Sequence, residues 1–462
     1  MRRTPLSMLA HWAQGTLHGE DVAIDGLSND TRAIAPGSLY VALRGERFDG
    51  HDFAAAAQAA GAAALLVERL LDIALPQLLV ENSERALAQI AAGIQAGRDT
   101  AVFAITGSNG KTSVKTLLTA VLGHAARVQG KTVYATPGNR NNGIGLPLAV
   151  ADAPEDADWA VYEMGAGKPG DIAYLTDIAA PRYALVNNIA AAHLERMGSL
   201  LGVAQTKGAI YLALPADGVA VINADDAFGA WFEQACVPEG CRVLRFGLDL
   251  PADVSARAIV LGSDGAQFEL VTPQGVVPVQ LALGGRHNVG NALATAALAL
   301  AAGIPLQQVA DGLALARPVA GRQVAHALGN GATLIDDSYN ANPGSLGAAI
   351  AALAASGRDA WLVLGDMREL GPQARALHAA AGEQARSAGL ARVWTLGTLA
   401  DAASTAFGEG GRHFASHDAL AAALAAELPA GARCLIKGSR GSAMDKIVTA
   451  LLQRGEETHH VV

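Results

Sequence analysis

A short glycine loop at residues 107–112 constrains the fold of this chain more than any other feature. Its sequence is GSNGKT. The apolar run 101–105 before it is typical of a buried strand, and the run 113–118 after it is typical of the first turns of a helix. In such a unit the loop amides and the helix N-terminus point at anionic oxygens, and the lysine and threonine side chains can hold phosphate and Mg²⁺. The sequence therefore predicts a site for a nucleoside triphosphate.

The loop departs from the common GxxxxGK[ST] spacing. Ile105 stands where that pattern has its first glycine, which leaves the shorter string GxxGKT. So short a string also occurs in plain strand–helix turns. The flanking apolar strand and helix favour the phosphate loop over a plain turn.

Composition excludes several function classes. The chain has 462 residues, of which 51% are hydrophobic and 17% charged, so two to four domains with aliphatic cores are expected. The net charge of −9 argues against a nucleic-acid or anionic-membrane binder. Cys236, Cys241 and Cys434 form neither a metal spacing nor a disulfide framework, which predicts a cytoplasmic protein. No apolar stretch reaches the length of a membrane span, so no stable membrane insertion is expected.

Alternation of strand-like and helix-like segments predicts an α/β fold with three domains at 1–97, 98–312 and 313–462. The third is expected to have a parallel, doubly wound sheet, and the segment 241–282 of the second an antiparallel excursion. Strands are predicted at 39–43, 63–67, 101–105, 159–164, 183–189, 218–223, 332–336, 359–364, 392–396 and 432–437. Helices are predicted at 53–60, at 83–96 with Ser83 as its cap, and at 288–302.

Polar side chains at strand ends are candidates for chemistry. Glu163 ends an apolar strand, and a carboxylate at the carboxyl edge of a parallel sheet could hold Mg²⁺ beside phosphates. A helix-capping or solvated glutamate is the alternative. His193 follows another predicted strand, and Lys207 lies on the helical stretch after it. Taken alone, a structural histidine and a solvated lysine are the more common interpretations.

Three asparagines, Asn139, Asn141 and Asn142, crowd a glycine-rich turn where they could contact phosphate or substrate, although asparagine also simply makes turns. Asn288 and Asn291 are three residues apart at the start of a predicted helix. They could hydrogen-bond an adenine edge, and capping of the helix by Asn288 is the alternative.

The last third of the chain has two further polar turns. Asp336 and Asp337 end a predicted strand and precede an Asn- and Pro-containing run, where a sugar hydroxyl or a cation could bind. The run 437–440, KGSR, follows another strand end and suits a carboxylate or phosphate. A surface loop is the alternative for each.

The order of these features is more specific than any one of them. The chain carries, in sequence, the loop GSNGKT, Glu163, the run AHLE at 192–195, Lys207, the run GRHN at 285–288, Arg322 and the run DDSYNANP at 336–343. This order resembles the Mur ligase family across essentially the whole chain. The runs at 28–32, 45–51, 336–343 and 437–440 favour the branch that adds D-alanyl-D-alanine. The DYAHTPD-like and DNPR-like runs of the diaminopimelate- or lysine-adding branches are not found in the sequence.

The resemblance implies a fold and a reaction. The three domains would be a UDP-binding N-terminal domain, a P-loop-type ATPase domain with a mostly parallel sheet and a Rossmann-like C-terminal domain. The γ-phosphoryl of ATP would move to the carboxylate of UDP-N-acetylmuramoyl-tripeptide, and the amine of D-alanyl-D-alanine would displace phosphate from the acyl phosphate, a step of peptidoglycan synthesis. The resemblance also implies a monomer with bound ATP and Mg²⁺ whose domains close on the substrates.

The resemblance also implies roles for individual residues. Catalysis would fall to Lys111, Glu163, His193, Lys207 and Arg322. The nucleotide would meet Gly107, Ser108, Asn109, Gly110, Lys111, Thr112, Ser113, Asn288, Asn291, Arg322 and Asp337. Metal would be held by Thr112, Glu163, His193 and Lys207, where Lys207 matches a lysine that is carbamylated in some members. The substrates would meet Ser28, Asp30, Thr31, Arg32, Arg47, Asp49, Gly50, His51, Asn139, Asn142, Tyr339, Asn340, Asn342, Ser439 and Arg440.

Three alternatives stay open on sequence alone: another amino-acid-adding ligase of the family, a folylpolyglutamate synthase-like enzyme, and a P-loop regulatory NTPase. The first-domain match to a UDP-sugar binder argues against the folate branch. The third residue of the tripeptide, diaminopimelate or lysine, is left undetermined.

Overall fold

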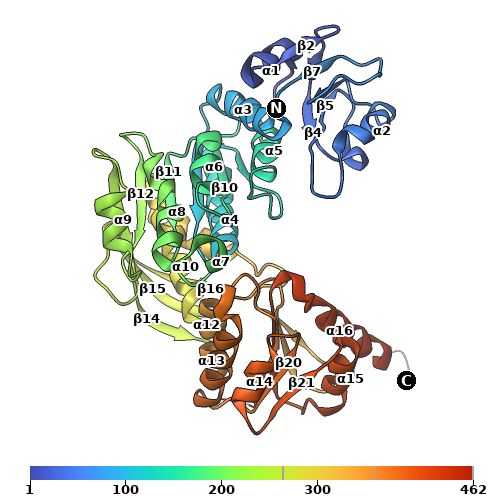
Figure 1. The fold of residues 1–462 in the computed structure, drawn as a ribbon. Coiled ribbons are helices and arrows are strands. Elements are labelled where there is room, and N and C mark those ends of the chain that lie inside the picture. The colour runs from blue at the N-terminus through green and yellow to red at the C-terminus, as the bar shows by residue number, and fades with distance from the viewer. Residues whose placement is uncertain (263–264, 358, 460–462) are drawn as a thin grey trace.

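The computed structural model describes residues 1–262, 265–357 and 359–459. Three α/β domains follow one another along the chain, and the central one lies between the other two (Figure 1). This arrangement agrees with the predicted fold class. The last residues of the predicted third domain, 460–462, lie outside the described part, and the exact domain boundaries remain a prediction.

The N-terminal domain is built on a five-stranded sheet in the order β2-β7-β6-β5-β4. Its elements are β1 (Thr4–Pro5), α1 (Leu6–Ala13), β2 (Thr16–His18), β3 (Ala23–Ile24), β4 (Gly26–Ser28), β5 (Ser38–Val41), α2 (Ala54–Ala59), β6 (Ala64–Val67), β7 (Gln77–Leu79) and α3 (Ser83–Ala96). Within this sheet β4 to β7 are parallel and β2 is antiparallel to β7, while β1 and β3 form a separate antiparallel pair. The predicted cap of α3 was one residue off, because Asn82, not Ser83, accepts the capping hydrogen bond from the Arg85 amide.

The central domain has a six-stranded, all-parallel sheet in the order β13-β12-β11-β8-β10-β9. Its elements as far as the helix before the third domain are β8 (Ala101–Thr106), α4 (Lys111–Gln129), β9 (Val133–Ala135), α5 (Gly145–Asp152), β10 (Trp159–Glu163), α6 (Asp171–Ala179), β11 (Tyr183–Val186), α7 (Leu194–Met197), α8 (Leu200–Leu212), β12 (Val219–Asn223), α9 (Gly229–Ala235), β13 (Arg242–Phe246), β14 (Ser255–Leu261), β15 (Ala266–Thr272), β16 (Gly275–Leu281), α10 (Arg286–Ala301) and α11 (Leu306–Leu315).

Two buried cores cover the faces of this sheet. Helices α4, α10 and α11 pack with β14–β16 on one face, and α6, α8 and α9 pack on the other. Strands buried on both faces read as continuous apolar runs, which is why β8 and β10 were visible in the sequence. The phosphate loop leaves the end of β8, in the interior of the sheet.

Two predictions for the central domain need correction. The segment 241–282 is not antiparallel throughout, because β13 pairs in parallel with β12 after the α9 crossover, and only β14–β16 form an antiparallel sheet. The strand predicted at 183–189 ends at Val186. From Asn187 onward the chain turns to the phosphate loop. The other strands and helices for which bounds were predicted begin and end within two residues of those bounds.

The C-terminal domain has a six-stranded sheet in the order β17-β18-β22-β19-β20-β21. Its elements are β17 (Val324–Ala327), β18 (Thr333–Asp337), α12 (Pro343–Ala354), β19 (Ala360–Gly365), α13 (Ala374–Ser387), β20 (Arg392–Leu396), α14 (Asp401–Phe407), β21 (Gly411–Phe414), α15 (His417–Glu427), β22 (Arg433–Lys437) and α16 (Asp445–His459). The sheet is mixed, not wholly parallel as predicted. Strands β17 and β18 are antiparallel, because the few residues between them allow a hairpin but no crossover helix.

Candidate active site

A cavity of about 1260 Å³ lies where the carboxyl ends of β8, β10 and β18 meet. Glu84 of α3, Lys111 and Glu163 of the central domain and Lys437 of the C-terminal domain all line it. In open α/β sheets the carboxyl ends of the strands are where ligands bind. The cavity therefore has the position of an active site and is shared by all three domains.

Many of the predicted site residues meet in this cavity. Those that line it are Ser108, Asn109, Gly110, Lys111, Thr112, Ser113, Asn139, Asn142, Glu163, His193, Asn288, Asn291, Arg322, Asp337, Tyr339, Asn340 and Asn342. Among the described residues, those that do not line it are Ser28, Asp30, Thr31, Arg32, Arg47, Asp49, Gly50, His51, Gly107, Lys207, Ser439 and Arg440.

The phosphate loop is held in a conformation that glycine makes possible. Gly107 and Gly110 have φ of 146° and 78°, in the region that side chains rarely adopt. A Cβ on Gly110 would also come within 2.5 Å of Asn187 Nδ2 and Asn291 Oδ1. Lys111 begins α4, and its Nζ donates a hydrogen bond to Gly107 O at 2.8 Å. Burial lowers the pKa of Lys111, and the nearby Glu163 opposes that shift.

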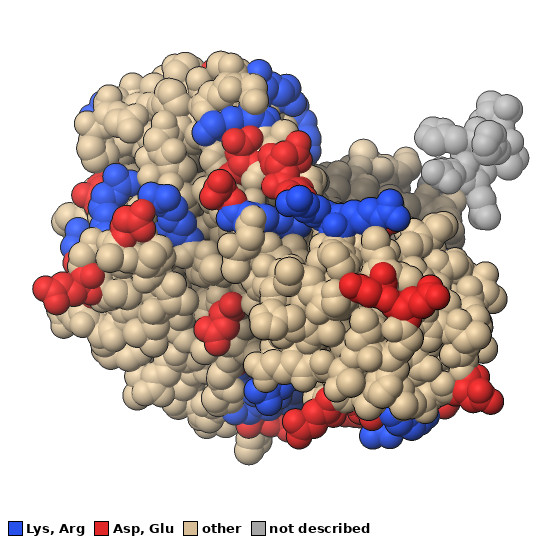
Figure 2. All heavy atoms as spheres, turned by 90° about the horizontal axis from the view of Figure 1, so that it is seen from above, with Lys and Arg blue, Asp and Glu red and all other residues tan. Residues whose placement is uncertain are grey.

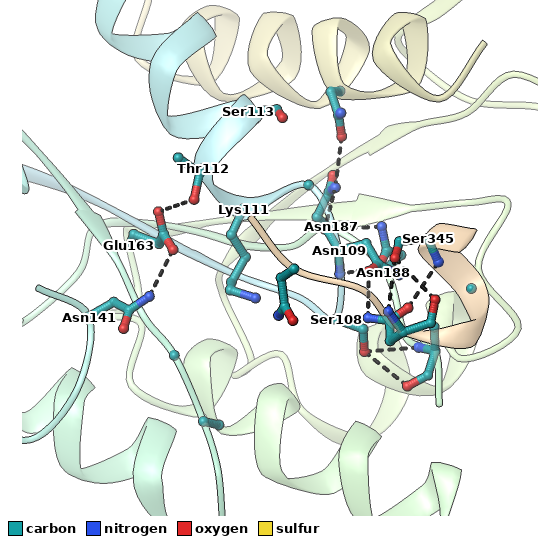
Figure 3. Close-up of a pocket in the computed structure, with 18 of the residues that line it drawn as sticks. Ser108, Asn109, Lys111, Thr112, Ser113, Asn141, Glu163, Asn187, Asn188 and Ser345 are labelled. Carbon is teal, nitrogen blue, oxygen red and sulfur yellow. Dashed lines mark hydrogen bonds between the residues drawn. The ribbon is translucent and has the colours of Figure 1, made fainter. Parts of the chain in front are cut away.

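Glu163 lies opposite the start of α4 and is 2% exposed. Thr112 Oγ1 donates to its Oε2 at 2.8 Å and Asn141 Nδ2 to its Oε1 at 2.8 Å (Figure 3). Burial alone would raise the pKa of Glu163, but Lys111, Lys115 and these hydrogen bonds outweigh it and lower the pKa. Glu163 is therefore an ionised carboxylate beside a hydroxyl and a lysine, and not a solvated surface acid.

Lys115 is a site residue that the sequence analysis missed. Its Nζ lies 3.5 Å from Glu163 Oε2 and donates hydrogen bonds to the carbonyls of Thr136 and Gly138. Its position four residues after Lys111 on α4 places both lysines on the same helix face. That spacing could have identified it.

His193 lines the cavity, whereas Lys207 is buried and does not line it. His193 lines the cavity in a left-handed conformation with φ of 54°, and its Nδ1 contacts the carboxylate of Glu369 from the C-terminal domain. Burial lowers the pKa of His193, against the effect of Glu369. Lys207 is 1% exposed on α8. Burial, and after it the charge of Lys111, place the pKa of Lys207 well below its ordinary value, so the solvated-lysine interpretation is wrong.

Asn288 and Asn291 are held in a polar chain on α10. Asn291 Nδ2 donates to Asn288 Oδ1 at 3.0 Å, and Asn288 Nδ2 donates to Gly284 O at 2.8 Å. The N-cap of α10 is Gly285, so Asn288 is not the cap. Both asparagines line the cavity, where an adenine edge could exchange hydrogen bonds with them.

The C-terminal side of the cavity is braced by an ion pair. Lys437 Nζ lies 2.7 Å from Asp337 Oδ2 and 3.0 Å from Asn340 O. Arg322 stacks its guanidinium 4.2 Å from the centre of the Tyr339 ring. Sequence reasoning noted Lys437 only as part of the run 437–440, because its partner is 100 residues away.

Two predicted substrate residues of the C-terminal domain lie outside the cavity wall. Ser439 is buried, and its Oγ accepts from the Arg368 amide at 2.9 Å and donates to Ala341 O at 3.2 Å. The guanidinium of Arg440 lies 5.9 Å from the ring of Tyr339.

Two pairs of predicted residues in the N-terminal domain, Asp30 with Arg32 and Asp49 with His51, contact each other. Asp30 accepts two hydrogen bonds from the Arg32 guanidinium, at 2.9 and 2.7 Å. His51 is 3% exposed, with its Nδ1 2.5 Å from Asp49 Oδ1, while its Nε2 accepts from the Glu68 amide at 2.8 Å. Because Nε2 is the acceptor, Nδ1 carries the proton and donates to Asp49. His51 therefore orders the loop that ends at Asp49.

The charged surface shows no bias toward one sign on the face seen from above, where basic side chains lie beside acidic ones (Figure 2). Among the helices that the structure describes, none has the length and apolarity to cross a membrane. Within the described residues no cluster of three or more His, Cys, Asp or Glu side chains could by itself hold a metal ion.

Three family models match the chain in order. "Mur ligase family, catalytic domain" matches residues 23–95, "Mur ligase middle domain" matches 105–299, and "Mur ligase, glutamate ligase domain" matches 321–440. Each match covers most of the largest sheet of one of the three domains.

Relatives of known name cover nearly the whole chain. The UDP-N-acetylmuramoyl-tripeptide–D-alanyl-D-alanine ligase of Escherichia coli K12 is 44% identical over 97% of this chain and 98% of its own. The crystal structure of MurF from Acinetobacter baumannii superposes with a TM-score of 0.90 at 32% identity, over 98% of this chain and 100% of that one. The MurF ligase of Thermotoga maritima in complex with ADP gives a TM-score of 0.81 at 27% identity, over 94% and 98%.

Proposed function

The chain belongs to the Mur ligase family, and on that premise we propose that it joins D-alanyl-D-alanine to UDP-N-acetylmuramoyl-tripeptide with ATP. The product is the UDP-N-acetylmuramoyl-pentapeptide of peptidoglycan synthesis. The observation that carries this function is the single cavity in which the phosphate loop, an ionised strand-end carboxylate and side chains of all three domains meet. The names of the relatives support the choice of substrates.

The reaction must first activate a carboxylate. A carboxylate oxygen of the tripeptide attacks the γ-phosphorus of ATP, the bond to the β-phosphate oxygen breaks, and ADP leaves. The amine of the dipeptide then attacks the acyl carbon, the tetrahedral intermediate expels phosphate, and the amine loses a proton as the amide forms. The first step brings two anions together, and the second builds an oxyanion beside a phosphate group, so fixed positive charge such as that of Lys111 lowers both barriers.

Mg²⁺ fits the pair Thr112 and Glu163. Mg²⁺ in nucleotide sites is typically held by one or two carboxylates, water and the phosphates of the substrate. Here a hydroxyl and an ionised carboxylate lie 2.8 Å apart next to the phosphate loop. When bound, the cation would neutralise charge on the phosphates. The charges of Lys111 and Lys115 lower the pKa of Glu163, so the carboxylate is ionised before a metal ion binds.

Lys207 fits carbamylation. The depressed pKa of this buried amine favours the neutral form, which is the nucleophile that CO₂ requires. Its nitrogen would form a bond to the carbon of CO₂ and release a proton, which leaves a carbamate. Together with the ring nitrogen of His193 that Glu369 does not contact, the carbamate would supply ligands for a second cation.

Substrate binding divides between the outer domains. The stretch 28–51 of the N-terminal domain would hold the UDP end, and Tyr339 and Asn340 would approach the peptide and the dipeptide. ATP would lie between the phosphate loop and Asn288. The free cysteines support action in the reducing cytoplasm. The monomeric state stays a prediction.

Substrate dropouts in an ATP turnover assay test the proposal. Phosphate release is expected only when the UDP-tripeptide and D-alanyl-D-alanine are both present, and mass spectrometry should show the pentapeptide. Turnover with a single amino acid would move the chain to another branch of the family. ATP hydrolysis indifferent to both substrates would instead favour a regulatory NTPase.

A further inference from the structure

Asparagine side chains form a continuous polar path from α10 to the C-terminal domain. Asn291 Oδ1 accepts from Asn187 Nδ2 at 2.9 Å, and the same Nδ2 lies 3.0 Å from Asn109 O. On the other side of the phosphate loop, Asn342 Nδ2 donates to Asn109 Oδ1 at 2.7 Å. The path joins segments that are up to 233 residues apart in the sequence.

Asn109 is held in place from the central domain through its backbone. Its carbonyl accepts from Asn187 Nδ2 at 3.0 Å and from Asn188 Nδ2 at 3.2 Å, and its amide donates to Asn188 Oδ1 at 2.9 Å (Figure 3). These three bonds do not use its side chain. The side chain of Asn109 is therefore presented by a fixed loop toward the C-terminal domain.

Asn342 is held in place from the C-terminal domain through its side chain. It is the N-cap of α12, and its Oδ1 accepts from the Ser345 amide at 2.9 Å in a capping box. The cap requires the amide oxygen to face the helix, which assigns the Nδ2 group to Asn109. The Nδ2 and Oδ1 of Asn342 thus link the phosphate loop to the start of α12.

The backbones also come close at this point. A Cβ on Gly344 would lie 3.0 Å from the Cβ of Ala190 and 3.3 Å from Asn109 Nδ2. The start of α12 thus packs against the phosphate loop and the segment after β11. At this point of close packing, the hydrogen bond from Asn342 to Asn109 fixes the orientation of α12.

We propose that Asn109 and Asn342 are positioning residues that set the C-terminal domain on the phosphate loop for the second half of the reaction. The proposal rests on the proposed function. Residues 337–342 carry Tyr339 and Asn340 into the cavity, so the Asn109–Asn342 bond fixes where the amine-bearing side of the site stands relative to the transferred phosphoryl group. Without it, water can reach the acyl phosphate before the amine does.

Asn342→Ser separates this role from helix capping. Serine caps a helix about as well as asparagine but has no amide to reach Asn109. The same exchange at Asn82, the N-cap of α3, is the matched control for capping, and both variants should unfold at similar temperatures. Because Asn82 also lines the cavity, this control is read by unfolding temperature and not by activity. For Asn342→Ser we expect kcat to fall about tenfold with the KM for ATP changed less than about twofold. ADP formed per pentapeptide should rise from one to several.

Asn109→Ala and the double variant complete the test. Asn109→Ala keeps the backbone bonds of the loop, so it should show the same excess of ADP over pentapeptide. The double variant should be no worse than either single variant, because the two changes remove the same bond. One ADP formed per pentapeptide in Asn342→Ser would overturn the inference. Losses of kcat that multiply in the double variant would also overturn it. Wild-type turnover that ignores the dipeptide would instead refute the proposed function.

Discussion

The central and N-terminal domains hold their charged residues in opposite ways. In the central domain, Glu163 is buried between Lys111 and Lys115, and its charge is maintained by the fold. In the N-terminal domain, Asp30 and Arg32 form an exposed pair that is screened by water. Buried charges fixed before the ligand arrives can stabilise a transition state, whereas an exposed pair contributes little until a ligand replaces one partner. Substitutions should therefore act on rate in one domain and on binding in the other.

The largest effect is expected for Lys111→Ala. The change removes the cation that the phosphate loop presents, so kcat/KM for ATP should fall by about a thousandfold. Steady-state kinetics with both substrates measures it, and thermal unfolding checks that the fold is intact. A loss of less than tenfold would show that the loop amides alone carry the phosphates.

Glu163→Gln should have the next largest effect. The amide keeps the shape and the Thr112 contact but removes the charge, so the Mg²⁺ concentration for half-maximal activity should rise about tenfold and kcat should fall about a hundredfold. A magnesium titration of wild type and variant measures both. An unchanged magnesium titration would mean that Glu163 does not bind the metal ion.

The same variant gives a pH test of stability. The folded-state pKa of Glu163 is lowered, so it contributes stability above its unfolded pKa that is lost as pH falls through the folded pKa. As the pH is lowered, the free energy of unfolding of Glu163→Gln should therefore fall less steeply than that of the wild type. An equal slope would contradict the pKa direction.

Arg32→Ala tests whether the exposed pair of the N-terminal domain acts on substrate binding and not on rate. Its unfolding temperature should change by less than about 1 °C, because the Asp30–Arg32 pair is exposed. The KM for the UDP-tripeptide should rise about tenfold if this arginine turns to the diphosphate, with kcat unchanged. A drop in kcat with constant KM would place Arg32 in the chemistry instead of binding.

The last prediction concerns stability and not rate, and is made for Lys207→Met in CO₂-free buffer. The folded pKa of Lys207 lies below its unfolded pKa, so the unfolded chain binds more protons and wild-type stability rises with pH through that window. The variant should unfold roughly 3 °C higher at pH 7, and the difference should shrink as pH rises toward about 10.5. A destabilised variant at neutral pH would mean that Lys207 is charged and paired.

Residues at the ends of predictable strands could be found from the sequence. Glu163 ends a fully buried parallel strand, and topology places such a strand end at the ligand edge, next to the loop after β8. Lys115 was within reach through helical spacing. Glu369 could not be found in this way, because its contact with His193 crosses a domain interface. Asn187 was missed because the strand predicted to run to residue 189 ends three residues earlier.

The N-terminal predictions illustrate a different limit. His51 was assigned to substrate from the resemblance, yet its ring is buried and orders the loop through Asp49 and the Glu68 amide. A sequence pattern does not distinguish a residue that touches a ligand from one that holds the loop beside it. Only the direction of each side chain separates the two roles.

Transfer of oxygen from the tripeptide carboxylate to phosphate tests the central claim most directly. The UDP-tripeptide is labelled with ¹⁸O in its terminal carboxylate, and the phosphate released during ligation is analysed by mass spectrometry. An acyl phosphate formed in this cavity predicts that each phosphate carries one oxygen from the carboxylate. Phosphate without the label, formed together with the pentapeptide, would contradict the mechanism.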